Sequence, residues 1–406
     1  MKMIEGGVCA AKGFRANGIH CGIRANKTKK DLAAIVSDVP CQAAGVYTTN
    51  LVKGAPILVT KANIADGIAQ AVICNSGIAN TCNANGVQIA EEMGAMAAAA
   101  LGVKEHDMIV ASTGVIGQPL DLAPIEKGLP ELAAGLAYGE AGNDNASRAI
   151  MTTDTVPKSV AVEFELDGKV CHIGGIAKGS GMIHPNMATM LVFITTDAAI
   201  TAGMLQKALS ADVKKTFNMT SVDGDTSTND TCVILANGLA GNKPVDGEGA
   251  DFTAFMQALN TVTVALCRKI AGDGEGATRL LECRLTGAVD DASAAKMAKS
   301  VICSSLVKAA MFGADANWGR ILCAIGYAGV EVDVNKVDVS FVSAAGQIAV
   351  CKNGAAIDFS EEIAKKILLE KEIDIVVALH DGEGSATAWG CDLTYDYVKI
   401  NGDYRT

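Results

Sequence analysis

The chain has 406 residues, of which 50% are hydrophobic, 4% aromatic and 19% charged, and its formal net charge is −11. This length allows two or three domains with a sizeable aliphatic core, and the negative charge argues against nucleic acid, whose phosphates need a basic face. No uninterrupted apolar run of about eighteen residues occurs, which excludes a transmembrane helix, and residues 1–22 lack the apolar core of a signal peptide. We therefore expect a cytoplasmic protein that binds neither membranes nor nucleic acid.

The predicted elements of the first half alternate between strands and helices. The Asn- and Gly-rich stretch 75–86 is expected to be a loop, and Pro130 is expected to split one helix into two pieces. Residues 143–157 are polar and without a periodic pattern, which indicates an extended loop. The expected strands are 56–60, 70–74 and 108–111, and the expected helices are 87–101 and 122–136.

The second half continues the same alternation. An apolar, β-branched run from Met190 to Thr196 is typical of a buried strand. The stretch 221–230 is mostly polar and predicts a loop. Helices are expected at 202–217, 252–270 and 291–309, a strand at 231–235, and a last α/β portion from 361 to the end. Such alternation favours an α/β fold in which helices cover sheets.

The thirteen cysteines are scattered along the chain without a C-x-x-C pair. Most of them lie in apolar segments, which is typical of reduced cysteines that pack as small core residues. We therefore expect no disulfide framework and no metal site.

The segment from Lys178 to Leu191 is the most informative part of the sequence. It places Thr189 after the small residue Ala188 and directly before the apolar run, where a tight loop would deliver a hydroxyl to the start of a core strand. If the Ala188–Thr189 bond were cut, Thr189 would carry a free α-amine beside its own hydroxyl. A threonine activated by its own N-terminal amine is a known catalytic nucleophile.

A second polar motif, Ser112-Thr113-Gly114, follows the strand expected at 108–111. Such a turn can direct a hydroxyl and a backbone N–H toward a developing oxyanion. Other catalytic motifs are missing, because the sequence contains no phosphate-binding G-x-x-x-x-G-K-[ST] and no G-x-S-x-G. The threonine nucleophile is therefore the chemistry that the sequence favours.

Several long motifs, in the same order along the chain, resemble the ornithine acetyltransferases (glutamate N-acetyltransferases) of arginine biosynthesis. The resemblance extends from Gly7 to Thr406. Its motifs are the Gly-Val-x-Ala-x-Lys-Gly-Phe stretch from Gly7, residues 151–155, 178–191, 223–230 and 314–320, and the C-terminal stretch 397–406.

The resemblance implies a chain that cuts itself before Thr189 into an α piece, residues 1–188, and a β piece, residues 189–406, of which two copies each form a heterotetramer. The fold that we expect is an αββα-type layered sandwich with an N-terminal-threonine nucleophile, and a smaller C-terminal α/β portion from about residue 280. The implied oxyanion pair is Thr113 and Gly114. The implied substrate-binding residues are Thr155, Lys178, Thr189, Glu275, Asn401 and Thr406.

The implied reaction is transfer of the acetyl group from N2-acetyl-L-ornithine to L-glutamate through an acetyl-Thr189 ester, without a cofactor. Acetyl-CoA as a second acetyl donor stays open, because enzymes with and without that ability share these motifs. One alternative is an N-terminal-threonine amidase or aminopeptidase, in which water takes the acyl group. The other alternative is a catalytically silent protein that binds an amino acid.

Overall fold

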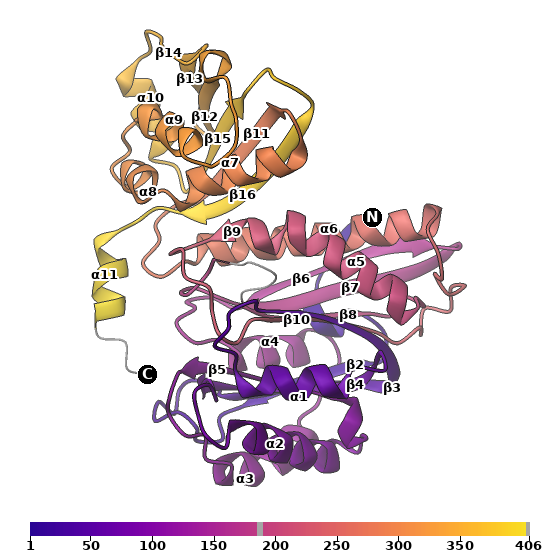
Figure 1. Cartoon of the computed structure of the whole chain (residues 1–406). Helices are drawn as coiled ribbons and strands as arrows, with labels where there is room; N and C mark the ends of the chain where they lie inside the picture. Colours follow the sequence, from indigo (N-terminus) through magenta and orange to yellow (C-terminus); the bar gives the residue numbers. More distant parts are fainter. Residues whose placement is uncertain (185–189, 403–406) are drawn as a thin grey trace.

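The computed structural model describes residues 1–184 and 190–402, and it contains two β-sheets covered by helices (Figure 1). The larger sheet has nine strands in the order β1-β6-β7-β8-β10-β3-β4-β5, and β2 pairs with β3. Its strands are β1 (Lys2–Ile4), β2 (Phe14–Ile19), β3 (Leu32–Tyr47), β4 (Ile68–Ile78), β5 (Met108–Val115), β6 (Lys158–Leu166), β7 (Lys169–Lys178), β8 (Leu191–Thr196) and β10 (Thr231–Ala236).

Helices α1, α2 and α3 lie on one outer side of this curved sheet, and α5 and α6 lie on the other (Figure 1). Helix α4 lies inside, between the two halves of the sheet, where it contacts β2 and β3 as well as β6 and β7. Alternate residues of β3 show the layering: Ala33 and Ile35 pack with α4 in one core cluster, whereas Ala34 and Val36 pack with α2 and α3 in another. The helices are α1 (Ala55–Asn63), α2 (Gly86–Leu101), α3 (Ala123–Ala134), α4 (Gly139–Ala149), α5 (Ala202–Lys215) and α6 (Ala250–Gly272).

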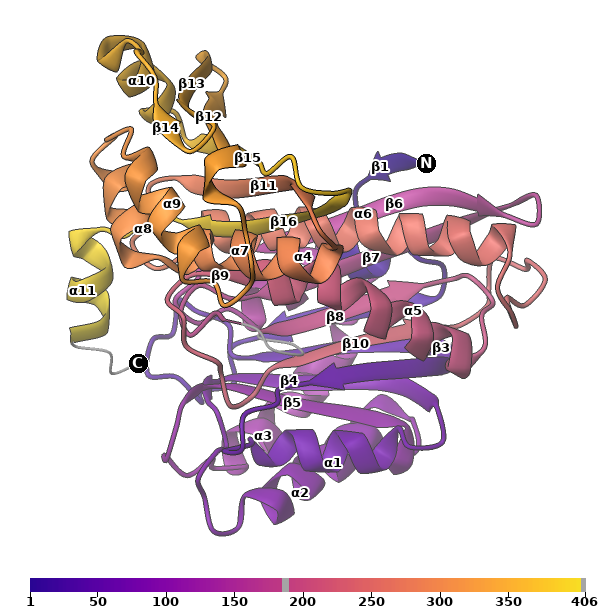
Figure 2. The same cartoon turned by 45° about the horizontal axis from the view of Figure 1, so that its top comes forward.

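The smaller sheet has seven strands in the order β14-β13-β12-β15-β11-β16-β9. Helix α6 packs against β6 of the larger sheet and against β11 and β16 of the smaller one, so a single core cluster continues from one sheet to the other (Figure 2). The elements are β9 (Thr220–Ser221), β11 (Leu280–Ala288), β12 (Asp338–Ser343), β13 (Gly346–Lys352), β14 (Ala355–Ala356), β15 (Glu372–Ala378), β16 (Gly384–Cys391), α7 (Asp291–Cys303), α8 (Ser305–Phe312), α9 (Trp318–Gly326), α10 (Glu361–Leu368) and α11 (Tyr395–Gly402).

The α/β class with layered sheets and helices is confirmed, but five local predictions are wrong. The loop expected at 75–86 begins only after Ile78, because β4 continues through residues 75–78 in register with β5. The stretch 56–60 belongs to α1, because Pro56 is tolerated in the first helical turn. Helix α3 continues through Pro130, whose exposed position lets water solvate the carbonyl group that it leaves unpaired. Residues 143–149 are helical, and the expected helix at 291–309 is divided at Ser304, which caps α8.

The structure also bears on the predictions made from the cysteines and from the apolar runs of the sequence. All thirteen cysteines are free thiols, and nine of them are buried, as expected for small core residues. In the described part of the chain, every helix is too short or too polar to span a lipid bilayer.

Candidate functional site

A cavity of about 120 Å³ lies at the ends of β5 and β7, and five of the predicted site residues line it. These five are Thr113, Gly114, Lys178, Glu275 and Asn401. Five further lining residues were given no role from the sequence, although all five belong to the motifs 151–155, 178–191 and 223–230. They are Thr152, Thr153, Gly181, Met182 and Ser227.

Thr113 and Gly114 reach the cavity because the parallel strands β4 and β5 end there together. Thr113 pairs with Ser76 and Gly114 with Gly77. Gly114 has a φ of +131°, and a Cβ atom at this position would lie 2.2 Å from the carbonyl carbon of Gly77. Only glycine fits this close approach of two backbones, so the turn geometry depends on that residue.

Lys178, the last residue of β7, faces the cavity from another strand of the same sheet. Its side chain is buried, and it pairs in register with Leu191, the first residue of β8. Leu191 in turn pairs with Thr231 at the start of β10. The described chain resumes at Met190, and β8, the strand that follows Thr189 in the sequence, begins one residue later, directly beside the end of β7.

Met190 itself has an unusual backbone. Its φ is +143°, a value that side-chain-bearing residues rarely adopt, and its carbonyl oxygen accepts a hydrogen bond of 2.8 Å from the N–H of Thr231. Strained residues of this kind concentrate at functional sites. Ala188, Thr189 and Thr406, which the sequence predicts as cleavage and binding residues, lie outside the described residues.

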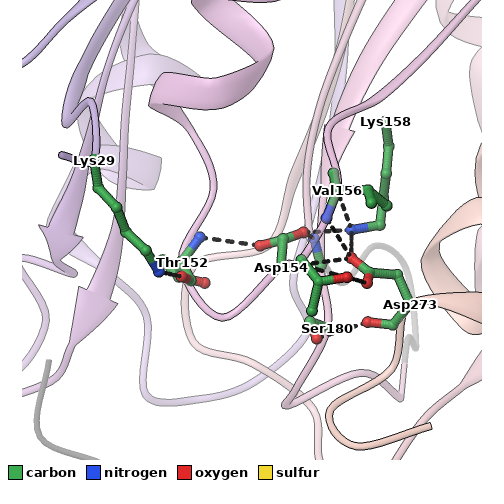
Figure 3. Close-up of polar contacts among 9 residues, drawn as sticks. Lys29, Thr152, Asp154, Val156, Lys158, Ser180 and Asp273 are labelled. Atoms are coloured by element: carbon green, nitrogen blue, oxygen red, sulfur yellow. Dashed lines mark hydrogen bonds and ion pairs between the residues drawn. The ribbon is translucent and has the colours of Figure 1, made fainter.

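Behind the cavity, Asp154, Lys158 and Asp273 form a buried ion cluster, which we call the Lys158 cluster (Figure 3). Lys158 Nζ donates to Asp154 Oδ1 and to Asp273 Oδ2, both at 2.6 Å. The N–H of Gly179 donates to Asp154 Oδ1 at 2.7 Å, and the N–H of Thr152 to Asp154 Oδ2 at 3.0 Å. The cluster therefore holds the segment after β7 and the 152–155 segment together.

The charge state of this cluster follows from its contacts. Burial opposes ionisation of Asp154, but the ammonium groups of Lys158 and Lys178 and the hydrogen bonds from Lys158 and Gly179 outweigh burial. Together they hold the pKa of the Asp154 carboxyl well below its usual range. Asp154 is therefore a carboxylate at neutral pH, and its negative charge offsets part of the positive charge of the two buried lysines.

Thr155, predicted as a substrate-binding residue, does not line the cavity as the structure describes it. Its N–H and its hydroxyl both donate to the carboxylate of Asp273. The structure therefore places Thr155 in contact with the Lys158 cluster.

Glu275 reaches the cavity wall through backbone contacts of the loop after α6. Its N–H donates to the carbonyl oxygen of Ser180 at 3.0 Å, and Ser180 Oγ donates to the carbonyl oxygen of Asp273 at 2.7 Å. The carboxylate lies so close to Gly181 that a Cβ atom there would be 2.3 Å from it. Gly181 thus makes room for Glu275.

Asn401, in the C-terminal helix α11, completes this side of the cavity. Its Nδ2 donates to Glu275 Oε2 at 2.7 Å, so a residue near the end of the chain orients a carboxylate of the site. Gly276, with a φ of +69°, lets the helix approach, because a Cβ atom there would lie 2.6 Å from the backbone nitrogen of Tyr397.

The charged groups that the structure describes in this site are not arranged as metal ligands. Within residues 1–184 and 190–402, no group of three or more His, Cys, Asp or Glu side chains is arranged to hold a metal ion. The wall instead combines one ammonium group, one carboxylate, hydroxyls and backbone groups. Such a wall can bind a small zwitterion and stabilise an oxyanion.

Comparison with known proteins gives matches over the whole chain. An arginine biosynthesis bifunctional protein ArgJ of Symbiobacterium thermophilum is 51% identical over 408 residues, covering 100% of both chains. The protein of that name from Caldanaerobacter subterraneus is 48% identical over 407 residues, again covering 100% of both. A crystal structure of the Bacillus halodurans ArgJ protein shares 49% identity and covers 51% of this chain and 96% of its own, with a TM-score of 0.49.

The model of the ArgJ family matches residues 15–406, which is nearly the entire sequence. Together with relatives about half identical over their full length, this match settles the family. The chain belongs to the ArgJ family.

Proposed function

We propose that this enzyme transfers the acetyl group of N2-acetyl-L-ornithine to L-glutamate, as a step of arginine biosynthesis. Family membership supports the pathway, since its relatives are named arginine biosynthesis proteins. The observation that carries the proposal is the cavity, where an oxyanion turn, a lysine and a glutamate meet beside the strand that follows Thr189.

The reaction begins with self-cleavage. The hydroxyl of Thr189 attacks the carbonyl carbon of Ala188, and hydrolysis of the resulting ester frees the α-amine of Thr189. An α-amine has a reference pKa of about 7.7–8.0, which suits a general base at neutral pH. Thr189 then serves as nucleophile and base in one residue.

Acetyl transfer follows in two halves. Thr189 Oγ attacks the acetyl carbonyl of N2-acetylornithine, ornithine leaves with the proton, and the amine of glutamate then attacks the acetyl-Thr189 ester. The Thr113 hydroxyl and the Gly114 N–H stabilise the tetrahedral oxyanion, and each such donor contributes about 3 kcal/mol. No cofactor takes part in these steps.

The charges of the wall match the substrates. Both N2-acetylornithine and glutamate carry an α-carboxylate, which Lys178 can pair with. The ornithine side chain ends in an ammonium group, for which the carboxylate of Glu275 is the complement. Asn401, which already donates to Glu275, holds that carboxylate in place.

The finer features of the proposal concern subunit assembly, further substrate contacts and a second acetyl donor. We propose a cytoplasmic heterotetramer of two α pieces (residues 1–188) and two β pieces (189–406), with Thr155 and Thr406 as further substrate contacts. The word bifunctional in the relatives' names supports a second activity, for which acetyl-CoA-dependent acetylation of glutamate is the candidate.

An acetyl-transfer assay tests the proposal against its rival. Purified protein is incubated with N2-acetylornithine and glutamate, and N-acetylglutamate, ornithine and free acetate are quantified. The proposal expects N-acetylglutamate and ornithine in equal amounts. Acetate without N-acetylglutamate would instead support an N-terminal-threonine amidase, and no product at all would support a binding protein.

A further inference from the structure

Asn229, two residues before β10, has a side chain whose hydrogen bonds are all used. Its Nδ2 donates to the carbonyl oxygens of Ala79 at 2.6 Å and Ser112 at 2.9 Å. Its Oδ1 accepts from the hydroxyls of Thr81 at 2.5 Å and Thr228 at 2.6 Å. Because the two carbonyl oxygens can only accept, the NH₂ group must face them, and the orientation of the amide is fixed.

These contacts connect Asn229 to the oxyanion turn on both sides. The Ser112 carbonyl belongs to the peptide plane that leads into Thr113, so the bond from Asn229 restricts rotation of that plane. Ala79, the second acceptor, also donates its N–H to the carbonyl oxygen of Val115 at 2.9 Å. Asn229 therefore bridges the chain that flanks Thr113 and Gly114.

The packing around Asn229 leaves the amide little freedom. The residue is 6% exposed, and a Cβ atom on Gly54 would lie 2.6 Å from its amide nitrogen. The N–H of Gly54 donates to the carbonyl oxygen of Thr228 at 2.9 Å, which holds the two segments together. A rotated amide would lose buried hydrogen bonds, and each lost bond is costly.

Asn229 also has a fixed relation to the strand that follows Thr189. Strands β8 and β10 are parallel neighbours in which Leu191 pairs with Thr231. Along the sequence, Thr189 precedes Leu191 by two residues, and Asn229 precedes Thr231 by two residues. The same loop residue is thus tied to the oxyanion turn and to the neighbour of the nucleophile-bearing strand.

We propose that Asn229 is a positioning residue that sets the oxyanion turn relative to the strand carrying the nucleophile. Asn229 does not line the cavity as described, so it acts through Ser112 and Thr113 without touching substrate. The inference rests on the proposed acetyl transfer. Its consequence is a defect in kcat, because displaced oxyanion donors weaken binding of the transition state and leave ground-state binding unchanged.

The test compares Asn229→Asp with a matched control, Asn242→Asp. Asn242 is 5% exposed, and its Nδ2 donates to the carbonyl oxygens of Ala199 at 3.1 Å and Lys243 at 2.8 Å, away from the cavity. Both variants lose two donors and place a carboxylate against two carbonyl oxygens. Intact-mass measurement first gives the processed fraction of each preparation, and rates are expressed per processed enzyme.

Asn229→Asp is expected to lower kcat by about 10- to 100-fold, somewhat less than removal of one oxyanion donor, with KM changed less than about threefold. Asn242→Asp is expected to leave kcat within about twofold. In a Thr113→Ala background, the loss caused by Asn229→Asp should shrink to about threefold, since the donor that it positions is already missing.

Equal losses in the two asparagine variants, a loss confined to KM, or additive losses with Thr113→Ala would overturn the inference. If Asn229→Asp fails to fold or to cut itself, Thr81→Val is tested instead, because it removes only one donor to Asn229 Oδ1. Thr81→Val is expected to lower kcat by about 3- to 10-fold. An unchanged kcat in that variant would overturn the inference. A wild type that makes no N-acetylglutamate refutes the proposed function instead, and acetate release then supplies the kcat values for the same comparison.

Discussion

Two walls of the cavity are built by different kinds of structure. The strand wall consists of Thr113, Gly114 and Lys178, which lie at the ends of β5 and β7 and are held by the hydrogen bonds of the nine-stranded sheet. The loop wall consists of the loop residues Gly181 and Glu275 together with Asn401 of helix α11, and it depends on a few individual hydrogen bonds. The oxyanion turn of the strand wall is therefore suited to stabilising a transition state, whereas the loop wall, like Lys178, is suited to binding a charged group of the substrate.

The Lys158 cluster joins the two walls, and breaking it should have the largest effect. Lys158→Met leaves Asp154 and Asp273 as buried carboxylates without their cation, which is expected to lower the free energy of unfolding by about 3–5 kcal/mol. Urea unfolding at equal protein concentrations measures this change in the free energy of unfolding. Lys366→Met, which removes an exposed pair with Glu362, is the control and should cause no measurable change; equal changes in both would contradict the account.

The strand wall alone is tested by Gly114→Ala. Its Cβ atom would displace the backbone of Gly77, so kcat for acetyl transfer should fall about 100-fold, close to the cost of losing one oxyanion donor, while KM stays within about threefold. Gly117→Ala is the matched control, since Gly117 also has a positive φ of +80° but open space around its Cβ position. A comparable kcat loss in Gly117→Ala would assign the effect to backbone strain.

The loop wall alone is tested by Gly181→Ala. The added methyl group pushes the Glu275 carboxylate away from Asn401, so KM for N2-acetylornithine should rise about tenfold, as loss of one charge-assisted hydrogen bond predicts. Steady-state kinetics with both substrates measure this change, and kcat should vary little. Gly203→Ala, with open space at its Cβ position, should behave as wild type. A kcat defect like that of Gly114→Ala would erase the distinction between the walls.

The smallest expected effect is a pH dependence of stability. Because the folded-state pKa of Asp154 lies below its unfolded value, ionised Asp154 stabilises the fold above about pH 4, and this contribution is lost as the pH falls. Between pH 5 and pH 3.5, the free energy of unfolding of the wild type should fall by about 0.7 kcal/mol more than that of Asp154→Asn. Urea titrations at both pH values measure the difference, and identical slopes would show that Asp154 does not titrate as described.

The sequence predicted long periodic or apolar segments well. Strand β8, with its β-branched run, and helix α2, rich in Ala and Met, lie where they were expected. Helix α1 was mistaken for a strand because its run Pro-Ile-Leu-Val-Thr is short and β-branched, and periodicity does not separate the two cases over five residues. Helix α4 was missed because small residues such as Gly142 and Ala146, rather than large apolar ones, form its buried face.

The sequence predicted those residues of the site that lie in its recognisable motifs. Thr113, Gly114, Lys178, Glu275 and Asn401 were named from the sequence, and they line one cavity. Lys158 was not named from the sequence, because its partner Asp273 is 115 residues away and a single lysine does not reveal a buried ion pair. Asn229 belonged to a recognised motif, but its link to Ser112 exists only in the folded protein.

The central claim, that Thr189 cuts the chain and then carries the acetyl group, is tested most directly by intact-mass analysis of the wild type and Thr189→Ala. The account predicts that the wild type separates into two pieces that meet at Ala188 and Thr189, and that N2-acetylornithine adds one acetyl group to the piece beginning with Thr189. Thr189→Ala should remain one chain of 41.6 kDa without transfer activity. A Thr189→Ala protein that is cut at this bond, or that still transfers acetyl groups, would contradict the account.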